Sequence, residues 1–314
     1  MTRQSNGVAL TIGASVIWGT SFVAVSVGLQ FSNPYVLLFE RFLVASIAIL
    51  AIGVFSKSAR VWPELLRPHT WALGGIYTAG FLLQFLGQDI SGASMSALLS
   101  NLFVVFVPVA ALFVLGERMT NSSKIAVVLS LFGIILVFSS ALHYVGSALG
   151  DLTLVGSSIG YTMFIVLGKK FDISSLASSF AIIVSMTAIM APLAIIAGGP
   201  VSLDEILNPA DWESVLWLGL PCTVVALAMY TRGLASIRAS QSATLLLLEI
   251  LVGIALSVSL LGEKLGFSQI LGAFVIAVAI VLSSRPSTSL PGRSLRESAV
   301  AGTSDYICGL KFPN

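Results

Sequence analysis

Residues 239–270 read ASQSATLLLLEILVGIALSVSLLGEKLGFSQI, and this stretch decides the fold of the chain. Its apolar run from Ser240 to Gly262 is broken by a single charge, Glu249. About 20 apolar residues are what an α-helix needs to cross roughly 30 Å of hydrocarbon. The stretch therefore predicts a membrane-spanning helix that carries one carboxyl group near its middle.

Much of this pattern occurs once before in the chain. Residues 96–97 and 242–243 are both Ser-Ala, and residues 115–117 and 261–263 are both Leu-Gly-Glu, always 146 residues apart. We therefore predict two copies of one design. The expected boundaries are a first half at 1–145, a second half at 146–284 and a tail at 285–314.

Composition excludes an ordinary soluble fold. Of the 314 residues, 56% are hydrophobic and only 10% are charged, against roughly a quarter charged in a typical soluble domain. A net charge of +2, with the basic residues scattered in short clusters, does not suggest nucleic acid as a partner. Cys222 and Cys308 form no metal-ligand or disulfide pattern, and no P-loop is present, so we expect no metal, cofactor or ATP hydrolysis.

Apolar runs separated by short polar segments predict ten spans. All ten should be helices, because hydrocarbon offers no other partner for backbone amides in runs of this length. The first, from residue 8, is longer than the core of a cleaved signal peptide, so we expect it to be retained. The predicted spans are 8–28, 34–55, 70–88, 92–116, 124–142, 151–168, 175–199, 214–231, 240–262 and 266–284.

The distribution of Lys and Arg predicts the orientation, because cytoplasmic loops are enriched in both. With the N-terminus inside, the inner segments hold 14 of the 16 basic residues. The exceptions are Arg41, inside a span, and Lys264, while the loop at 200–213 carries acidic residues only. We predict two cytoplasmic termini. Five spans per half is an odd number, so the second half must be inverted relative to the first.

Residues 285–314 are rich in Ser, Gly, Pro and Arg and too poor in apolar groups to fold alone. We expect a mobile cytoplasmic tail.

These features resemble the drug/metabolite transporter superfamily, and specifically its ten-span EamA-type permeases with two inverted five-helix halves. The resemblance rests on the Leu-Gly-Glu-basic turns at 115–118 and 261–264, on TLLLLE at 244–249, on Trp18-Gly19 and on residues 40–42. It implies an integral protein of the inner (plasma) membrane that moves small organic solutes, often outward: amino acids, other metabolites or toxic organic compounds.

One departure from the family pattern concerns the ninth span. Such permeases often have Pro directly after the Glu, whereas this chain has Ile250. The resemblance therefore leaves a kink in that helix without its usual cause, while Pro108 can supply one in the fourth span.

Glu249 is the first candidate for the site. A charged carboxyl in mid-membrane is costly, so it should be protonated, paired or facing water. Helical spacing places Ser242, Gly253 and Ser257 close to its face, a small and polar stripe that suits a cavity. Two interpretations stay open: solute binding with a coupling proton, or a neutral Glu hydrogen-bonded between helices for structure.

Arg41 is the second candidate, roughly 10 Å inside its span. It either faces the pathway, holding an anionic substrate group or a distant carboxylate, or it snorkels outward or bonds a neighbouring helix.

Polar and aromatic groups complete the candidate site. Uncharged groups of this kind can bind a solute and still release it. The alternative for the aromatic residues is anchoring at the interface or helix packing. A weak repeat similarity aligns two of them, Trp18 and Tyr161. The full set is Trp18, Tyr77, Gln84, Asn101, Tyr161 and Tyr230, with Phe81, Gln88, Ser94 and Pro108 at helical spacing beside them.

An enzymatic interpretation fails on its context. Residues 156–160 match G-x-S-x-G, but that motif needs a strand, a sharp turn and a base, and here it lies in an apolar helix. His69 and His143 are predicted on opposite membrane faces. We expect Gly156 and Gly160 to serve close helix packing.

The sequence thus predicts a secondary transporter and exporter with small-molecule substrates, a lipid environment and alternating access. The competing classes are an intramembrane enzyme, which lacks a cluster of reactive groups, and a channel or scaffold, against which the heterogeneous pathway residues argue. Solute identity and oligomeric state do not follow from these residues.

Overall fold

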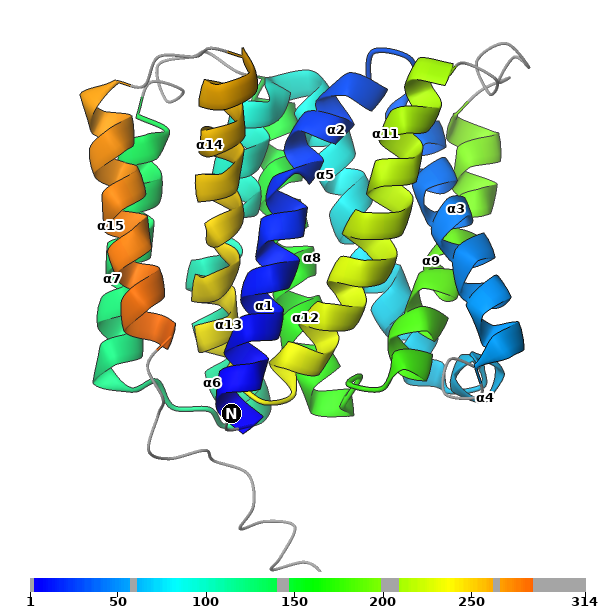
Figure 1. Cartoon of the computed structure of the whole chain (residues 1–314), viewed down its shortest axis with the longest axis horizontal. Helices are drawn as coiled ribbons and strands as arrows, with labels where there is room; N and C mark the ends of the chain where they lie inside the picture. The colour runs from blue at the N-terminus through cyan, green and yellow to red at the C-terminus, as the bar shows by residue number, and fades with distance from the viewer. Residues whose placement is uncertain (1–2, 57–60, 140–146, 199–208, 262–265, 285–314) are drawn as a thin grey trace, which may run out of the picture.

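The computed structural model describes residues 3–56, 61–139, 147–198, 209–261 and 266–284, and within these ranges every regular element is helical (Figure 1). The elements are α1 (Arg3–Gly19), α2 (Ser21–Gly28), α3 (Pro34–Phe55), α4 (Trp62–Leu65), α5 (Pro68–Ser100), α6 (Phe103–Leu115), α7 (Asn121–Val137), α8 (Ala148–Phe171), α9 (Leu176–Ala197), α11 (Pro209–Gly219), a π-helical turn (Leu220–Val225), α12 (Ala226–Leu234), α13 (Ala239–Leu246), α14 (Leu248–Leu261) and α15 (Phe267–Ser284).

Eight helical stretches among the described residues are long and apolar enough to cross a membrane. They are Arg3–Gly28, Pro34–Phe55, Met95–Leu115, Ala148–Phe171, Leu176–Ala197, Trp212–Leu234, Ala239–Leu256 and Phe267–Ser284. The predicted fifth span appears as the shorter apolar helix α7, and the predicted third as the first arm of α5. His143, most of the 200–213 loop, Glu263, Lys264 and the tail lie outside the described residues.

The chain reverses direction within α5, at Gly92. This residue has φ 79° and ψ 170°, a conformation that is open in practice only to glycine. A straight helix would separate Gln84 from Ser100 by about 24 Å. Both nevertheless line one cavity, so the two arms of α5 run antiparallel. The sequence predicts this reversal at residues 89–91, between the third and fourth predicted spans. In the structure it lies one residue later, at Gly92, and no separate loop joins the two arms.

Two membrane helices are interrupted at equivalent positions of the sequence repeat. The fourth predicted span breaks between α5 and α6 at Asn101 and Leu102, and the ninth breaks between α13 and α14 at Leu247, 146 residues after Asn101. The ninth span therefore breaks without a proline. Side chains that bond the carbonyl four residues earlier promote such bends, and Asn101 Nδ2 donates to the Ala97 carbonyl at 2.8 Å.

Close backbone contacts tie the helices together. A Cβ at Gly160 on α8 would lie 2.9 Å from the Gly80 Cα on α5, which confirms the predicted packing role of Gly160. A Cβ at Gly133 on α7 would lie 3.0 Å from the Gly272 carbonyl oxygen on α15. In Figure 1, α7 and α15 stand side by side at one edge of the bundle, and α3 and α9 lie toward the opposite edge.

Gly160→Ala should lower the melting temperature of the purified protein in detergent. The added methyl group would press on the α5 backbone, and overpacking of this kind costs about 1–3 kcal/mol. Gly75→Ala is the matched control, because its Cβ would meet only Ile189 Cδ1 at 3.8 Å, an ordinary contact. Equal melting temperatures for the two variants would contradict the proposed tight approach of α5 and α8.

Candidate functional site

A cavity lies where helices from both parts of the sequence meet. Six of the eight predicted site residues line it: Glu249, Trp18, Tyr77, Gln84, Tyr161 and Tyr230. The remaining lining residues are Ser21, Phe81, Ser100, Phe103, Phe164, Ile165 and Leu246. Seven of the 13 side chains are aromatic, and Glu249 supplies the only carboxyl group of this lining.

Glu249 sits at the start of α14, directly after the helix break at Leu247. Its side chain is buried close to that of Asn101, which stands at the equivalent break of the first repeat. Asn101 does not line the cavity, and its buried Oδ1 has no hydrogen-bond partner among the described residues. The two interrupted helices therefore present a carboxyl group and an amide to each other beside the cavity.

The aromatic walls are held by contacts between rings and by hydroxyl groups. Tyr77 stacks on Phe164 with ring centroids 3.8 Å apart and an interplanar angle of 7°. The Tyr161 hydroxyl donates to Gln84 Oε1 across α8 and α5. Tyr230 packs on Trp18 at 5.3 Å between centroids. These contacts hold four tyrosine and tryptophan rings at the cavity surface.

Ser242 supports this wall from behind. Its hydroxyl donates to the Tyr230 hydroxyl at 3.1 Å, so this member of the predicted polar stripe acts through Tyr230. Gly253 lies near the Gly19 carbonyl oxygen, 3.8 Å from where its Cβ would be, and so belongs to the contact with α1. The side chain of Ser257 lies outside the described part.

Arg41 is fully inside the protein and only 1% exposed, so the snorkelling alternative is wrong. Its Nε donates to Thr223 Oγ1 at 2.8 Å, on the π-helical turn. Its guanidinium carbon lies 4.4 Å from the centroid of the Phe81 ring. Arg41 bonds a neighbouring helix, as one interpretation predicted, and it does not itself line the cavity, whereas Phe81 does.

The eighth predicted span contains a π-helical turn at Leu220–Val225, and side chains of other helices donate hydrogen bonds to this turn. Pro221 has no N–H and its ring clashes with the carbonyl four residues earlier, which disrupts the regular pattern. Carbonyl groups released in this way need other donors inside a membrane. Trp18 Nε1 donates to the Cys222 carbonyl at 2.7 Å, and at the other break Ser15 Oγ donates to the Leu246 carbonyl at 2.7 Å.

A charged network closes the bundle at the end where α1 begins. Glu117, two residues after the end of α6, pairs through Oε1 with Lys169 Nζ at 2.8 Å. Its Oε2 accepts the backbone N–H of Ala239, the first residue of α13, at 2.9 Å. Lys169 also donates to the Ile237 carbonyl. One carboxylate thus joins the α6–α7 turn, the end of α8 and the start of α13.

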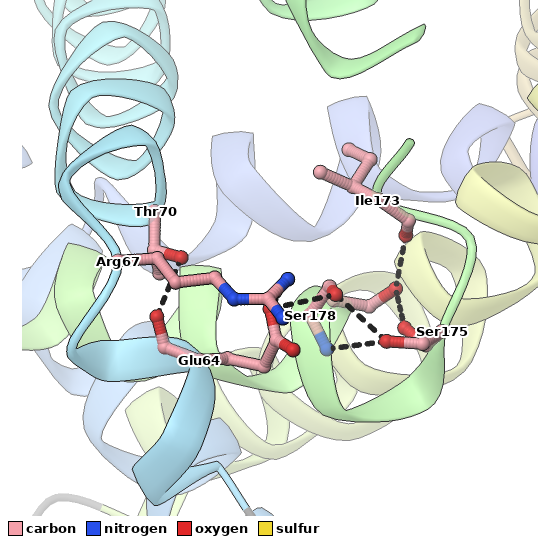
Figure 2. A network of polar contacts seen from close by, with 7 residues as sticks. Glu64, Arg67, Thr70, Ile173, Ser175 and Ser178 are labelled. Atoms are coloured by element: carbon pink, nitrogen blue, oxygen red, sulfur yellow. Dashed lines mark hydrogen bonds and ion pairs between the residues drawn. The ribbon is translucent and has the colours of Figure 1, made fainter. Parts of the chain in front are cut away.

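A second polar network ties α4 to α9 at the same end (Figure 2). Glu64 Oε2 accepts Ser178 Oγ at 3.0 Å and pairs with Arg67, while the Glu64 carbonyl accepts Thr70 Oγ1 at 2.8 Å. The Ser175 hydroxyl caps α9 by accepting the Ser178 N–H at 3.0 Å. The first part of the chain is therefore anchored to the start of α9.

Sequence reasoning missed several of these residues. Phe164 lies three residues after Tyr161, on the same helical face, and this spacing could have indicated it. Nothing local pairs Glu117 with Lys169, which are distant in sequence. Gln88, one helical turn beyond Gln84, instead donates to Ser26 Oγ at 3.0 Å.

The EamA-like transporter family model matches this chain twice, at residues 5–139 and 148–285. An "Uncharacterized transporter" of Archaeoglobus fulgidus is 29% identical over 88% of this chain and 96% of its own. A "Probable amino-acid metabolite efflux pump" of Escherichia coli is 24% identical over 90% of this chain and 95% of its own.

A solved crystal structure has the same fold. It superposes with a TM-score of 0.73 at 17% identity and covers 89% of this chain and 96% of that one. An "Uncharacterized inner membrane transporter" of Escherichia coli is 27% identical over 49% of each chain. The apolar helices, the central cavity and the two family matches together show that the chain is a multi-pass membrane protein of the EamA-like transporter family, within the drug/metabolite transporter superfamily.

Proposed function

We propose that the chain is a secondary transporter that exports small organic solutes by alternating access to the central cavity. The observation that carries this proposal is the convergence of the two interrupted helices on Glu249 and Asn101 beside an aromatic-lined space. Broken helices at a midplane site between repeats are a recurrent transporter design.

The proposed topology has ten spanning helices in two inverted halves, with both termini cytoplasmic. In support, Lys and Arg outside the spans gather at the end where α1 begins: within the described residues they are Arg3, Arg67, Arg118, Lys124, Lys169, Lys170, Arg232 and Arg238. The opposite end holds Asp89, Asp151 and Glu213. Enrichment of basic residues marks the cytoplasmic side.

Labelling from outside intact cells tests this topology. Single cysteines replace the exposed residues Lys170 and Glu213 in a background with Cys222→Ser and Cys308→Ser. An impermeant thiol reagent should modify only the cysteine at position 213 until the cells are permeabilised. Modification of position 170 alone would reverse the orientation, and modification of both would contradict the span count between them.

Alternating access requires each end to open and close. The Glu117–Lys169 pair joins segments from both family matches, which suits a closure that breaks and re-forms. Export is favoured by the relatives named as efflux pumps. Those names also favour amino-acid metabolites as the solute class, and a cavity with aromatic walls and a few polar groups can hold such compounds.

A comparison of metabolite levels tests export. Cells that produce the wild-type protein and cells that produce equal amounts of Glu249→Gln protein are loaded with a broad set of metabolites. At least one small organic compound should be retained less in wild-type cells. Identical profiles for wild-type, variant and empty cells would overturn the proposal.

A further inference from the structure

The cavity lining is electrically one-sided. Glu249 supplies its carboxyl group, and neither Lys nor Arg is among the residues that line it. The Arg41 guanidinium does not line the cavity and lies against the ring of Phe81, which does. As the cavity stands, it presents a carboxyl group and aromatic faces, which suit a protonated amine.

Arg41 has no anionic partner within salt-bridge distance among the described residues. Neither ion pair of this part of the chain includes it, and its Nε donates to the neutral hydroxyl of Thr223. A charged group buried in a membrane protein is costly unless it is paired, and such groups commonly face a substrate pathway. Rings of Phe42 and Phe85 lie 6.0 Å from its guanidinium carbon, so these walls are apolar.

Phe81 is the only one of these three phenylalanines that also lines the cavity. Its ring packs on Tyr77 at 4.6 Å and edge-on against Tyr161 at 5.5 Å between centroids. Phe81 therefore contacts the cavity, and the centroid of its ring lies 4.4 Å from the Arg41 guanidinium carbon. Rotation or removal of this one ring would add a guanidinium to the binding surface.

We propose that Phe81 is a specificity-determining residue that covers Arg41, and that a carboxylate on the solute binds Arg41 when the Phe81 ring turns away. With the ring in place, the site favours an amine at Glu249. With the ring displaced, it also takes the carboxylate of an amino acid or organic acid. This inference rests on the proposed function, because it assigns the central cavity as the solute site.

Binding of three matched compounds to the reconstituted full chain tests the proposal. The probes are 2-phenylethylamine, 3-phenylpropionate and phenylalanine, which share an aromatic body and differ in charge. Phe81→Ala should raise affinity for 3-phenylpropionate relative to 2-phenylethylamine by about tenfold or more, the usual scale for a hydrogen bond to a charged group. Phe81→Leu should shift the ratio in the same direction and serves if the alanine variant does not fold.

Two further variants complete the experiment. Phe85→Ala removes a ring that lies 6.0 Å from the Arg41 guanidinium carbon but does not line the cavity, so it should leave the ratio unchanged. Adding Arg41→Gln to Phe81→Ala should abolish the gain. An unchanged ratio in Phe81→Ala, or an equal gain in Phe85→Ala, overturns the inference while metabolite export by wild-type cells still supports the proposed function. If no probe binds to any variant, the inference is overturned as well. The proposed function is overturned separately, by the absence of export from cells that produce the wild-type protein.

Discussion

Glu249→Gln protein in reconstituted vesicles is expected to bind solute but to lose gradient-driven accumulation, down to the level of empty vesicles. Glutamine keeps the shape of the side chain and an acceptor oxygen near Asn101, but it cannot take up or release a proton. A site that cannot exchange a proton cannot use a proton gradient. Solute binding and uptake against an imposed pH gradient are measured on the same preparation.

The controls separate coupling from folding. Glu213→Gln removes an exposed carboxyl group that does not line the cavity and should leave accumulation unchanged. Glu249→Ala leaves a void and should reduce the yield of folded protein. Full gradient-driven accumulation by Glu249→Gln would exclude the coupling role and leave the structural interpretation of this residue.

Lys169→Met is expected to open the bundle at the end where α1 begins and to slow transport by an order of magnitude or more. It strands the buried Glu117 carboxylate, and breaking a buried ion pair costs about 3–5 kcal/mol. The double variant with Glu117→Gln should recover part of the loss, because the amide oxygen can still accept the Ala239 N–H and no charge is left alone.

The readout is the labelling rate of a cysteine at Leu246, which lines the cavity, in the background without Cys222 and Cys308. A reagent supplied from the N-terminal end should react several-fold faster in Lys169→Met. Arg67→Met removes a half-exposed ion pair at the same end and should change neither rate nor transport. If the effects of Lys169→Met and Glu117→Gln on the labelling rate simply add in the double variant, Glu117 and Lys169 do not act together.

The sequence was most informative where hydrocarbon constrains it. Long apolar runs predicted the helices, and the 146-residue offset of the repeat is also the offset between Asn101 and Leu247. The helix break at Leu247 could not be predicted from a proline. Related permeases often have Pro directly after the Glu, and this chain has Ile250 there. Instead, Ser15 Oγ donates to the Leu246 carbonyl at this break, a tertiary contact that no local pattern encodes.

Individual site residues were predictable by type, and their neighbours less so. Polar groups inside apolar runs are rare enough to attract attention, which identified Glu249, Gln84 and Arg41. Ordinary phenylalanines such as Phe81 and Phe164 carry no such signal, because membrane helices contain many of them. That Phe81 lines the cavity while Arg41 lies against its ring depends on how three helices pack, which no local pattern encodes.

The π-helical turn makes the eighth predicted span tolerant of one change in chain length. Such a turn accommodates one more residue than regular α-helix, so it behaves as a stable insertion. A single-residue deletion within Leu220–Val225 would convert the turn to regular α-helix, and the segments on its two sides would keep nearly the same relative rotation. Tyr230 would therefore stay against Trp18. Comparisons of this chain with other transporters should treat a one-residue gap at this position as a local change that preserves the geometry of the cavity.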